Sequence, residues 1–258
     1  MTLMLLSVVF GLMIGSFLNV CIYRMQREQS IIRPRSRCPA CGASIAWYDN
    51  IPVISFLLLG GKCRNCSAAV SWRYSLVELL CALMAMGLVH RWQGQWLWLA
   101  GVFICACMLF IITFIDLDTF LIPDELSLGL VITGLVFSFV NPYLSGSLWL
   151  KPVYSLAGGA VGFILMWFLA VSGEKIFKKE AVGGGDLKLL AGIGAMLGWQ
   201  GAASTLLLAS FLGSVYGLSL MAMKKARRDD PIPFGPFLAA GAMINLFKFI
   251  PLSSFLLM

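Results

Sequence analysis

Charged side chains are scarce in this sequence, and histidine is almost absent. Only 12% of the 258 residues are Asp, Glu, Lys or Arg, whereas 60% are hydrophobic. This balance excludes an ordinary soluble domain, in which about a quarter of the residues are charged. The single histidine, His90, stands beside Arg91 and Trp92 at the end of an apolar stretch. That position favours an interfacial anchor over a catalytic role.

Apolar stretches long enough to cross a membrane recur along the chain. A helix of roughly 20 apolar residues spans the ~30 Å hydrocarbon core of a bilayer. The eight candidate stretches are residues 2–22, 74–90, 96–115, 125–141, 152–172, 187–200, 202–222 and 234–255. The first has neither a preceding basic region nor a small-residue cleavage site, so we do not expect a removed signal peptide. The sequence predicts an all-α polytopic membrane protein with about eight transmembrane helices.

Basic residues gather in three segments of the chain. Segments 24–73, 174–188 and 224–228 hold eight, four and four of the 19 Lys and Arg residues. With eight spans, all three lie on one side of the membrane, together with the loop 116–124. The positive-inside rule makes that side cytoplasmic and places both termini outside. Membrane topology therefore accounts for the net charge of +7, so we expect contact with lipid and no nucleic-acid partner.

Four cysteines in the predicted cytoplasmic segment 24–73 form the pattern C-x2-C-x21-C-x2-C. They are Cys38, Cys41, Cys63 and Cys66. Two such turns present four thiolates to one tetrahedral Zn²⁺, and thiols stay reduced in the cytoplasm, which favours metal over disulfides. Four cysteines leave no open coordination position, so we predict a structural zinc in a small β-rich lobe. A redox pair or metal-free thiols are the alternatives. Packing explains the other four cysteines, Cys21, Cys81, Cys105 and Cys107.

Aspartates stand at the rims of two apolar stretches. Asp116 follows the apolar run 110–115, and Asp186 follows three glycines, 183–185. An ionisable group at membrane depth is costly, which marks it as functional. We expect the two carboxylates to meet and hydrolyse a peptide bond: one accepts a proton from the attacking water, and the other donates to the carbonyl oxygen. The glycines would let a substrate backbone approach Asp186.

Other interpretations of the acidic residues stay open. Asp118 is two positions from Asp116 and points to another face of a helix, and of the two we favour Asp116. Asp124 and Glu125 follow Pro123, which is typical of the first turn of a helix. Asp186 could be only a helix cap. As a different class of function, membrane aspartates relay protons or ions in transporters, and a zinc-bearing scaffold without activity is a third possibility.

The order of these segments resembles the type IV prepilin peptidase family, bifunctional leader peptidases and N-methyltransferases that are intramembrane aspartic proteases. The matching segments are Gly-Ser-Phe-Leu-Asn-Val at 15–20 with Arg24, the four cysteines, 71–74 with Glu78, 116–124 and 183–188. They cover essentially the whole chain. The resemblance implies that Asp116 and Asp186 are catalytic. The loop has glycine where the family has a bulkier middle residue, a departure that we expect to be harmless.

The resemblance also implies substrates and a methyl donor. Such enzymes cut the basic leader from prepilins or pseudopilins after a glycine, at the cytoplasmic face of the bacterial inner membrane. They then methylate the new N-terminal residue with S-adenosylmethionine. No G-x-G-x-x-G between a strand and a helix supports methyl transfer independently. Asn19, Lys62 and Glu78 are candidates for it, and interhelical hydrogen bonding explains Asn19 and Glu78 equally well.

Three domains follow from this interpretation. Residues 1–23 form the first transmembrane helix, 24–73 a cytoplasmic zinc-binding lobe associated with methyl transfer, and 74–258 a transmembrane aspartic peptidase domain. The client is either a type IV pilus or a type II secretion system. The sequence says nothing about the oligomeric state.

Overall fold

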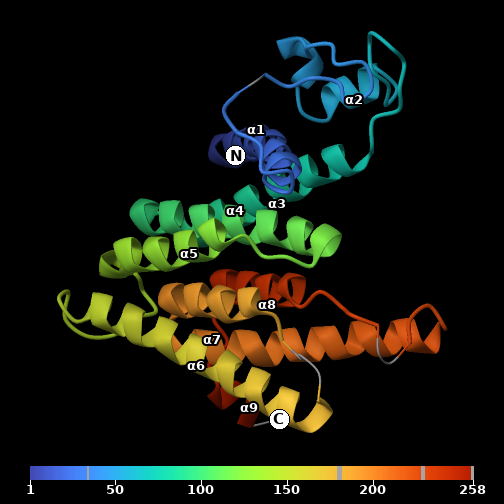
Figure 1. Cartoon of the computed structure of the whole chain (residues 1–258). Coiled ribbons are helices and arrows are strands. Elements are labelled where there is room, and N and C mark those ends of the chain that lie inside the picture. The colour runs from blue at the N-terminus through green and yellow to red at the C-terminus, as the bar shows by residue number, and fades with distance from the viewer. Residues whose placement is uncertain (34, 179–181, 228–229, 257–258) are drawn as a thin grey trace. The chain divides into compact units, whose positions relative to one another are not determined.

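The chain folds into helices that group into two compact units. The structure, a computed structural model, describes residues 1–33, 35–178, 182–227 and 230–256; Lys179 and Arg228, two of the basic residues counted above, lie outside these ranges. Unit 1 comprises Met1–Gly94 and unit 2 comprises Gln95–Met258 (Figure 1). No strand occurs within the described ranges. The predicted all-α fold is confirmed.

Unit 1 is a helix pair that carries a small lobe. The pair consists of α1 (Thr2–Met25) and α3 (Arg73–Trp92), which pack along each other. They approach closely because Gly11 and Gly15 have no side chains: an added Cβ would lie 2.6 Å from the Cα of Ala82 or of Glu78, respectively. Small residues four apart allow such close packing of helices in lipid.

The lobe between α1 and α3 contains two short helices and two tight turns. The helices are η1 (Trp47–Asn50) and α2 (Ile54–Leu58). Each turn is closed by a single antiparallel bridge, Arg37 to Ser44 and Lys62 to Ala69. The prediction of a β-rich lobe was therefore wrong. The backbone N–H and C=O groups of each Cys-x-x-Cys turn form hydrogen bonds within that turn. The antiparallel pairing therefore ends after one bridge.

Unit 2 holds the remaining helices. They are α4 (Trp96–Thr119), α5 (Asp124–Val136), η2 (Phe137–Val140), α6 (Lys151–Phe177), α7 (Gly184–Ala222), α8 (Gly235–Phe247) and α9 (Ser253–Leu256). Helix α7 is the centre of this unit, because α5, α6 and α8 all pack against it, and α8 also packs against α4. The short helix α8 thus contacts the helices that carry both predicted catalytic aspartates.

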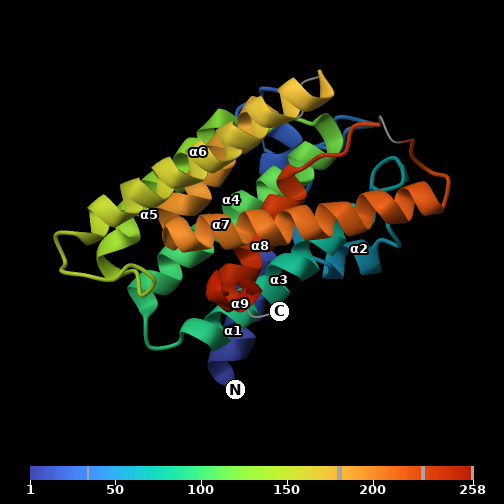
Figure 2. The ribbon, with the colours of Figure 1, turned by 90° about the horizontal axis from the view of Figure 1, so that it is seen from below.

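Helix α7 reverses its direction at Gly198. This residue has φ 74° and ψ 177°, which are not helical values. An added Cβ at Gly194 would lie 3.3 Å from the Cβ of Ala202, whereas a straight helix separates residues eight apart by about 12 Å. The ribbon of α7 doubles back in Figures 1 and 2. Two side chains donate hydrogen bonds to carbonyls just before this reversal. The side chain of Asn141 donates to the carbonyl of Met196, and that of Ser155 donates to the carbonyl of Ala195.

The count of eight transmembrane helices is not confirmed. Among the described residues, five helices are long and apolar enough to span a membrane: α1, α3, α4, α6 and α7. Helices α5 and α8 have 13 residues each, about 20 Å, which is shorter than the hydrocarbon core. The predicted division of 187–222 at Gly201 lies three residues beyond the observed reversal.

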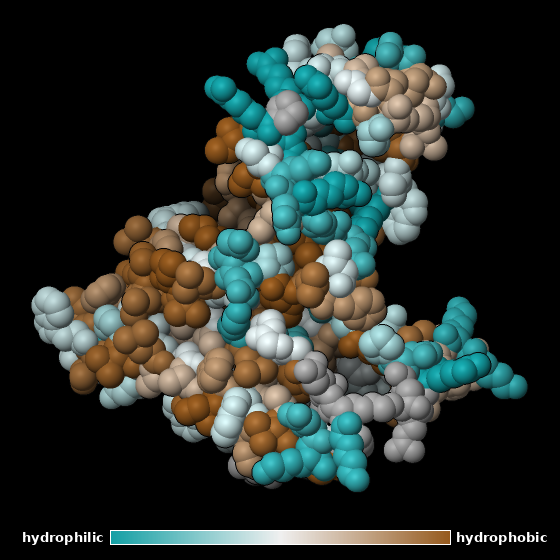
Figure 3. Space-filling model, in the orientation of Figure 1, coloured by the Kyte–Doolittle hydropathy of each residue, from teal (hydrophilic) through white to brown (hydrophobic). Residues whose placement is uncertain are grey.

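Apolar side chains cover the outer surfaces of the long helices. On α6 the residues Phe163, Ile164, Trp167 and Phe168 are all exposed. Brown, hydrophobic side chains also cover much of the face drawn in Figure 3. A helix that is apolar on its outside is suited to lipid rather than to water. The chain is a multi-pass membrane protein.

Candidate active site and metal centre

Asp116 lies in the last turn of α4, where the helix ends. Phe120 adopts a left-handed φ of 57°, and its N–H donates to the carbonyl of Asp116 at 2.9 Å. The Asp116 residue is only 4% exposed, and its Oδ2 accepts a hydrogen bond from the N–H of Gly235 at 2.9 Å. Buried polar groups in proteins are normally hydrogen-bonded, and here a helix start supplies the donor.

Asp186 lies in the first turn of α7. Gly183 has an extended backbone and precedes the helix. The backbone N–H of Asp186 donates to the carbonyl of Gly183 at 3.1 Å. Asp186 is 9% exposed, and its Oδ1 has no hydrogen-bond partner in the described part of the chain. A buried carboxylate oxygen without a partner is rare in a folded protein and is available to a proton, a water molecule or a substrate.

Ile122 joins the surroundings of the two aspartates. An added Cβ at Gly185 would lie 2.9 Å from the Cβ of Ile122, and one at Gly235 would lie 3.2 Å from its Cδ1. At Gly235 the same added atom would lie 2.6 Å from Oδ2 of Asp116. The two motifs, 70 residues apart in sequence, therefore meet within unit 2.

The other acidic residues of the first motif are placed differently. Asp118 is exposed, two residues beyond the buried Asp116. Asp124 begins α5, with Pro123 before it, as its helix-start interpretation predicted. Both carboxylate oxygens of Asp124 accept hydrogen bonds from Nζ of Lys188 at 2.7 Å. This ion pair ties the start of α5 to the first turns of α7.

Gly235 is a site residue that the sequence did not point to. It contacts Asp116 across 119 positions of sequence, a separation that leaves no periodic pattern. The available signal was Phe234-Gly235-Pro236, since proline is favoured in the first turn of a helix. That signal predicts a helix start but not its contact with Asp116.

The four predicted zinc ligands lie together in the lobe of unit 1. The sulfurs of Cys38, Cys41, Cys63 and Cys66 are all within 4.8 Å of one another. Sγ of Cys38 and Sγ of Cys66 are 3.8 Å apart. Four sulfurs bound to one tetrahedral Zn²⁺ at ~2.3 Å are expected about 3.8 Å apart. The spacing therefore suits a metal ion, and no sulfurs in the cluster are joined as a disulfide.

The two cysteine turns repeat the same backbone geometry 25 positions apart. Gly42 N–H donates to the carbonyl of Cys38, and Ser67 N–H donates to that of Cys63, both at 2.9 Å. Gly42 and Ser67 both have a left-handed φ, 71° and 58°. The backbone N–H of Ala43 and then the side chain of Asn65 lower the pKa of the Cys41 thiol to about 7.

Residues suggested for methyl transfer lie in unit 1. The side-chain amide of Asn19 donates to the carbonyl of Tyr74 at 2.9 Å, which is an interhelical contact. Lys62 is exposed beside the second cysteine turn. Glu78 is buried, and its Oε2 accepts a hydrogen bond from the N–H of Val53 at 2.8 Å. Glu78 thus contacts the lobe, not only a neighbouring helix.

Known proteins resemble the chain over nearly its whole length. The prepilin leader peptidase/N-methyltransferase of Aeromonas salmonicida strain A449 is 38% identical over 263 residues, which cover 92% of this chain and 88% of that protein. Proteins of the same name from Stutzerimonas stutzeri and Pseudomonas aeruginosa are 39% and 35% identical, each over 94% of this chain and 89% of the relative. Residues 103–218 match the family described as the type IV leader peptidase family. The chain belongs to this family.

Membership in the leader peptidase family fits the division into two units. Residues 9–92 match the bacterial peptidase A24 N-terminal domain, within unit 1, and the peptidase match lies within unit 2. The chain is therefore an enzyme, a peptidase with methyltransferase activity. The transporter alternative is not favoured. No solved structure matches the chain.

Proposed function

We propose that this leader peptidase cleaves prepilins or pseudopilins with Asp116 and Asp186 as its catalytic pair. The observation that carries the proposal is that two buried aspartates at helix ends of unit 2 lie in segments that both pack against Ile122. Carboxylates held close together share one proton, since ionising both is costly. A pair with one proton can act as base and acid in the same step.

The hydrogen bonds suggest which carboxylate takes which role. The Gly235 N–H favours negative charge on Oδ2 of Asp116, so Asp116 accepts a proton from the attacking water. Asp186, whose Oδ1 has no partner among the described residues, holds the shared proton and donates it to the oxygen of the scissile carbonyl. Asp116 then passes its proton to the leaving nitrogen as the C–N bond breaks, and a hydroxyl of the tetrahedral intermediate returns its proton to Asp186, so the pair again holds one proton.

Methyl transfer follows cleavage in this proposal. The acceptor is the new N-terminal amine, which exists only after the leader has been removed. S-adenosylmethionine supplies the methyl group, and the lobe 24–73 serves this second reaction. The cysteine cluster holds Zn²⁺, whose role is to fix the fold of the lobe. The peptidase reaction belongs to residues 74–258.

The membrane location completes the proposal. The enzyme lies in the bacterial inner membrane, with the aspartate pair and the zinc lobe at the cytoplasmic face. The apolar start of a mature pilin would then stay in lipid while its basic leader reaches the carboxylates. Cysteine-accessibility labelling that placed residue 118 outside, opposite residue 30, would contradict this arrangement.

The test is a mass measurement on a purified reaction. Enzyme, a prepilin and S-adenosylmethionine carrying a labelled methyl group should yield a product that lacks its leader and has gained one methyl group. Asp186→Asn should leave the precursor intact and unmethylated. The same variant should still methylate a substrate that was cleaved beforehand. Cleavage by Asp186→Asn would end the two-aspartate proposal.

A further inference from the structure

A cavity of about 330 Å³ lies in unit 1 between α1 and the lobe. Both of its walls mix apolar and polar residues, with Ile31 and Ile32 beside Arg35, Ser36 and Asn50 on the lobe side. The residues that matter here are Phe17 of α1 together with Arg24, Arg35 and Asn50. A neighbouring hollow of about 310 Å³ shares Arg35 and Asn50 and adds Trp47. The volume lies within the range of small-molecule sites, about 300–1,000 Å³.

The chemistry of the cavity suits a ligand with a carboxylate and a flat apolar part. Arg24 and Arg35 line it, and among the described residues no Asp or Glu lines either hollow. Guanidinium binds carboxylate through paired hydrogen bonds. Phe17 and Trp47 offer aromatic surfaces, and Asn50 offers both a donor and acceptors to a heterocycle. The Arg24 side chain is ordered by its hydrogen bond to the carbonyl of Ser30, at 2.8 Å.

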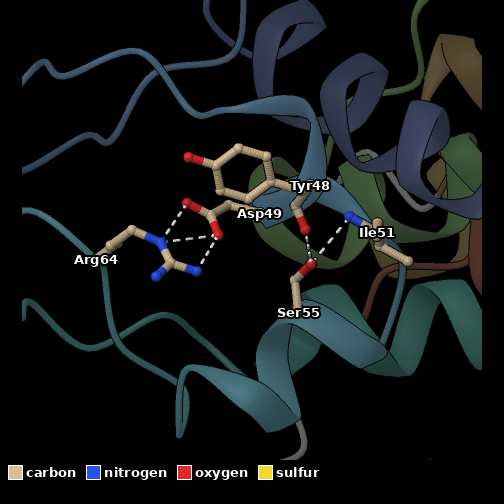
Figure 4. A network of polar contacts seen from close by, with 5 residues as sticks. All are labelled: Tyr48, Asp49, Ile51, Ser55 and Arg64. Atoms are coloured by element: carbon tan, nitrogen blue, oxygen red, sulfur yellow. Dashed lines mark hydrogen bonds and ion pairs between the residues drawn. The ribbon is translucent and has the colours of Figure 1, made fainter.

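Asn50 is held in place from both sides along the chain. Before it, both carboxylate oxygens of Asp49 accept hydrogen bonds from Arg64 of the second cysteine turn. This guanidinium holds the pKa of Asp49 below its ordinary value, so the pair persists across neutral pH. After it, the N–H of Ile51 donates to Oγ of Ser55, which itself donates to the carbonyl of Tyr48 (Figure 4).

A strained turn follows Asn50 and is fixed by Glu78. Val53 has φ 60° and ψ −48°, and the N–H of Ile54 donates to the carbonyl of Pro52 at 2.6 Å. These values describe a γ-turn of the rare, strained kind, with a β-branched residue at its centre. The N–H of Val53 donates to the buried carboxylate of Glu78, which also bonds Ser16 of the cavity wall. Strain of this kind persists only where the surroundings enforce it.

We propose that this cavity binds S-adenosylmethionine, with Arg35 and Arg24 on its carboxylate, and that Glu78 positions the cavity wall through the turn at Val53. This assignment rests on the methyl transfer proposed above. In the reaction the new amine forms a bond to the methyl carbon as the carbon–sulfur bond breaks. The bonding electrons stay on sulfur, giving S-adenosylhomocysteine, and the amine releases one proton to water. Glu78 is a positioning residue and touches neither reactant.

Equilibrium dialysis of full-length protein with labelled S-adenosylmethionine tests the site directly. The wild type should bind saturably, and Arg35→Gln should bind about ten-fold or more weakly, as expected for loss of a charge-assisted pair. Arg33→Gln, whose side chain does not line the cavity, is the matched control and should bind like the wild type. Methylthioadenosine has no carboxylate, so its affinity should be the same for the wild type and Arg35→Gln.

Several results would overturn the assignment. One is the absence of saturable binding to the wild type, and another is equal affinity of the wild type and Arg35→Gln for S-adenosylmethionine. A third is that Arg35→Gln loses bound phosphatidylglycerol but not S-adenosylmethionine, which would assign the cavity to a lipid headgroup. Failure of the proposed function is a different result. If the methyl donor binds with the expected dependence on Arg35 and yet no cleaved substrate is methylated, the site stands and the methyl-transfer proposal is wrong.

A rescue experiment tests the role of Glu78. Glu78→Ala should weaken binding of S-adenosylmethionine, whereas Glu78→Gln keeps an accepting oxygen and should retain it. Adding Val53→Gly to Glu78→Ala should restore binding, because glycine adopts this φ without strain. Adding Val53→Ala to Glu78→Ala should not restore binding, because alanine keeps a Cβ and with it the strain at this φ. Equal affinity in Glu78→Ala and wild type, or no rescue by glycine, would remove Glu78 from this role.

Discussion

The backbone N–H of Gly235 donates a hydrogen bond to Oδ2 of Asp116 at 2.9 Å, which brings the start of α8 onto the end of α4. The N-terminus of a helix carries partial positive charge and unpaired N–H groups. Helix α8 also packs against α7, the helix that begins beside Asp186. Gly235 at the start of α8 and Gly185 beside Asp186 both lie against Ile122, so the segments of the two aspartates are held against the same side chain.

Gly235→Ala should abolish most leader cleavage without unfolding the protein. The added Cβ would lie 2.6 Å from Oδ2 of Asp116, so the carboxylate or α8 must move. A displacement near 1 Å in a catalytic group lowers the rate by about 100-fold. Cleavage rates of purified variants check this prediction. Gly184→Ala is the matched control, since an added Cβ there meets nothing within 4 Å. Similar rates for both variants would contradict the role of Gly235.

The three glycines before Asp186 should not be equivalent. Gly185→Ala brings a Cβ within 2.9 Å of Ile122, whereas Gly184→Ala enters open space. We expect Gly185→Ala to slow cleavage strongly and Gly184→Ala to leave it nearly unchanged. The sequence suggested instead that all three serve substrate access. A series of cleavage rates in which Gly184→Ala is the slower variant would favour that earlier interpretation.

The sequence could indicate candidate polar groups for the site but not the residues that surround them. Apolar runs, cysteine spacing and isolated aspartates each have local signals, which is why the all-α fold and the cysteine cluster were found. The contacts of Ile122, Gly185 and Gly235 join segments far apart in sequence and involve residues without chemical groups. Nothing in a single sequence relates such positions. Asp118 and Asp116 look alike in sequence, and only burial distinguishes them.

The errors of sequence interpretation have physical causes as well. Hydropathy measured the length of apolar runs but not where a helix breaks, so α5 and α8 were expected to be longer than their 13 residues. The reversal of α7 depends on the positive φ of Gly198, and several other glycines in the same stretch remain helical.

Breaking the ion pair between Asp124 and Lys188 should have little effect on leader cleavage or on thermal stability. The side chains are 68% and 52% exposed, and exposed pairs contribute about 0–1 kcal/mol. Asp124→Asn and Lys188→Gln should each retain measurable cleavage, and thermal unfolding should shift by only a few degrees. High salt should reduce the difference from wild type, because it screens exposed charges. Complete inactivity of a folded Asp124→Asn protein would show that Asp124 takes part in the reaction.

Replacing one zinc ligand should separate the two activities. The purified protein should contain about one zinc, and Cys66→Ser should lower that content and make the lobe sensitive to proteases, because a four-thiolate site is not closed by three ligands. Cleavage, which depends on unit 2, should remain, while methylation should fall. Cys105→Ser, at a buried cysteine outside the cluster, is the control for zinc content. Metal-free protein with normal methylation would contradict a structural role of zinc.

The two cysteine turns should respond oppositely to glycine and serine. Ser67 adopts a left-handed φ that costs a residue with a side chain about 1 kcal/mol, whereas Gly42 adopts the same conformation freely. Ser67→Gly should therefore raise resistance of the lobe to chelators, and Gly42→Ser should lower it. Competition with a chromophoric chelator measures both. The same direction of change in both variants would show that the turns are not equivalent.

The most direct test of the aspartate pair is leader cleavage by three purified variants, followed by mass spectrometry of a prepilin. Asp116→Asn and Asp186→Asn should leave the leader attached while remaining folded and able to methylate a substrate cleaved beforehand. Asp118→Asn, an exposed neighbour, should cleave at a measurable rate. Full activity of Asp186→Asn, or an active Asp116→Asn beside an inactive Asp118→Asn, would contradict the proposed pair.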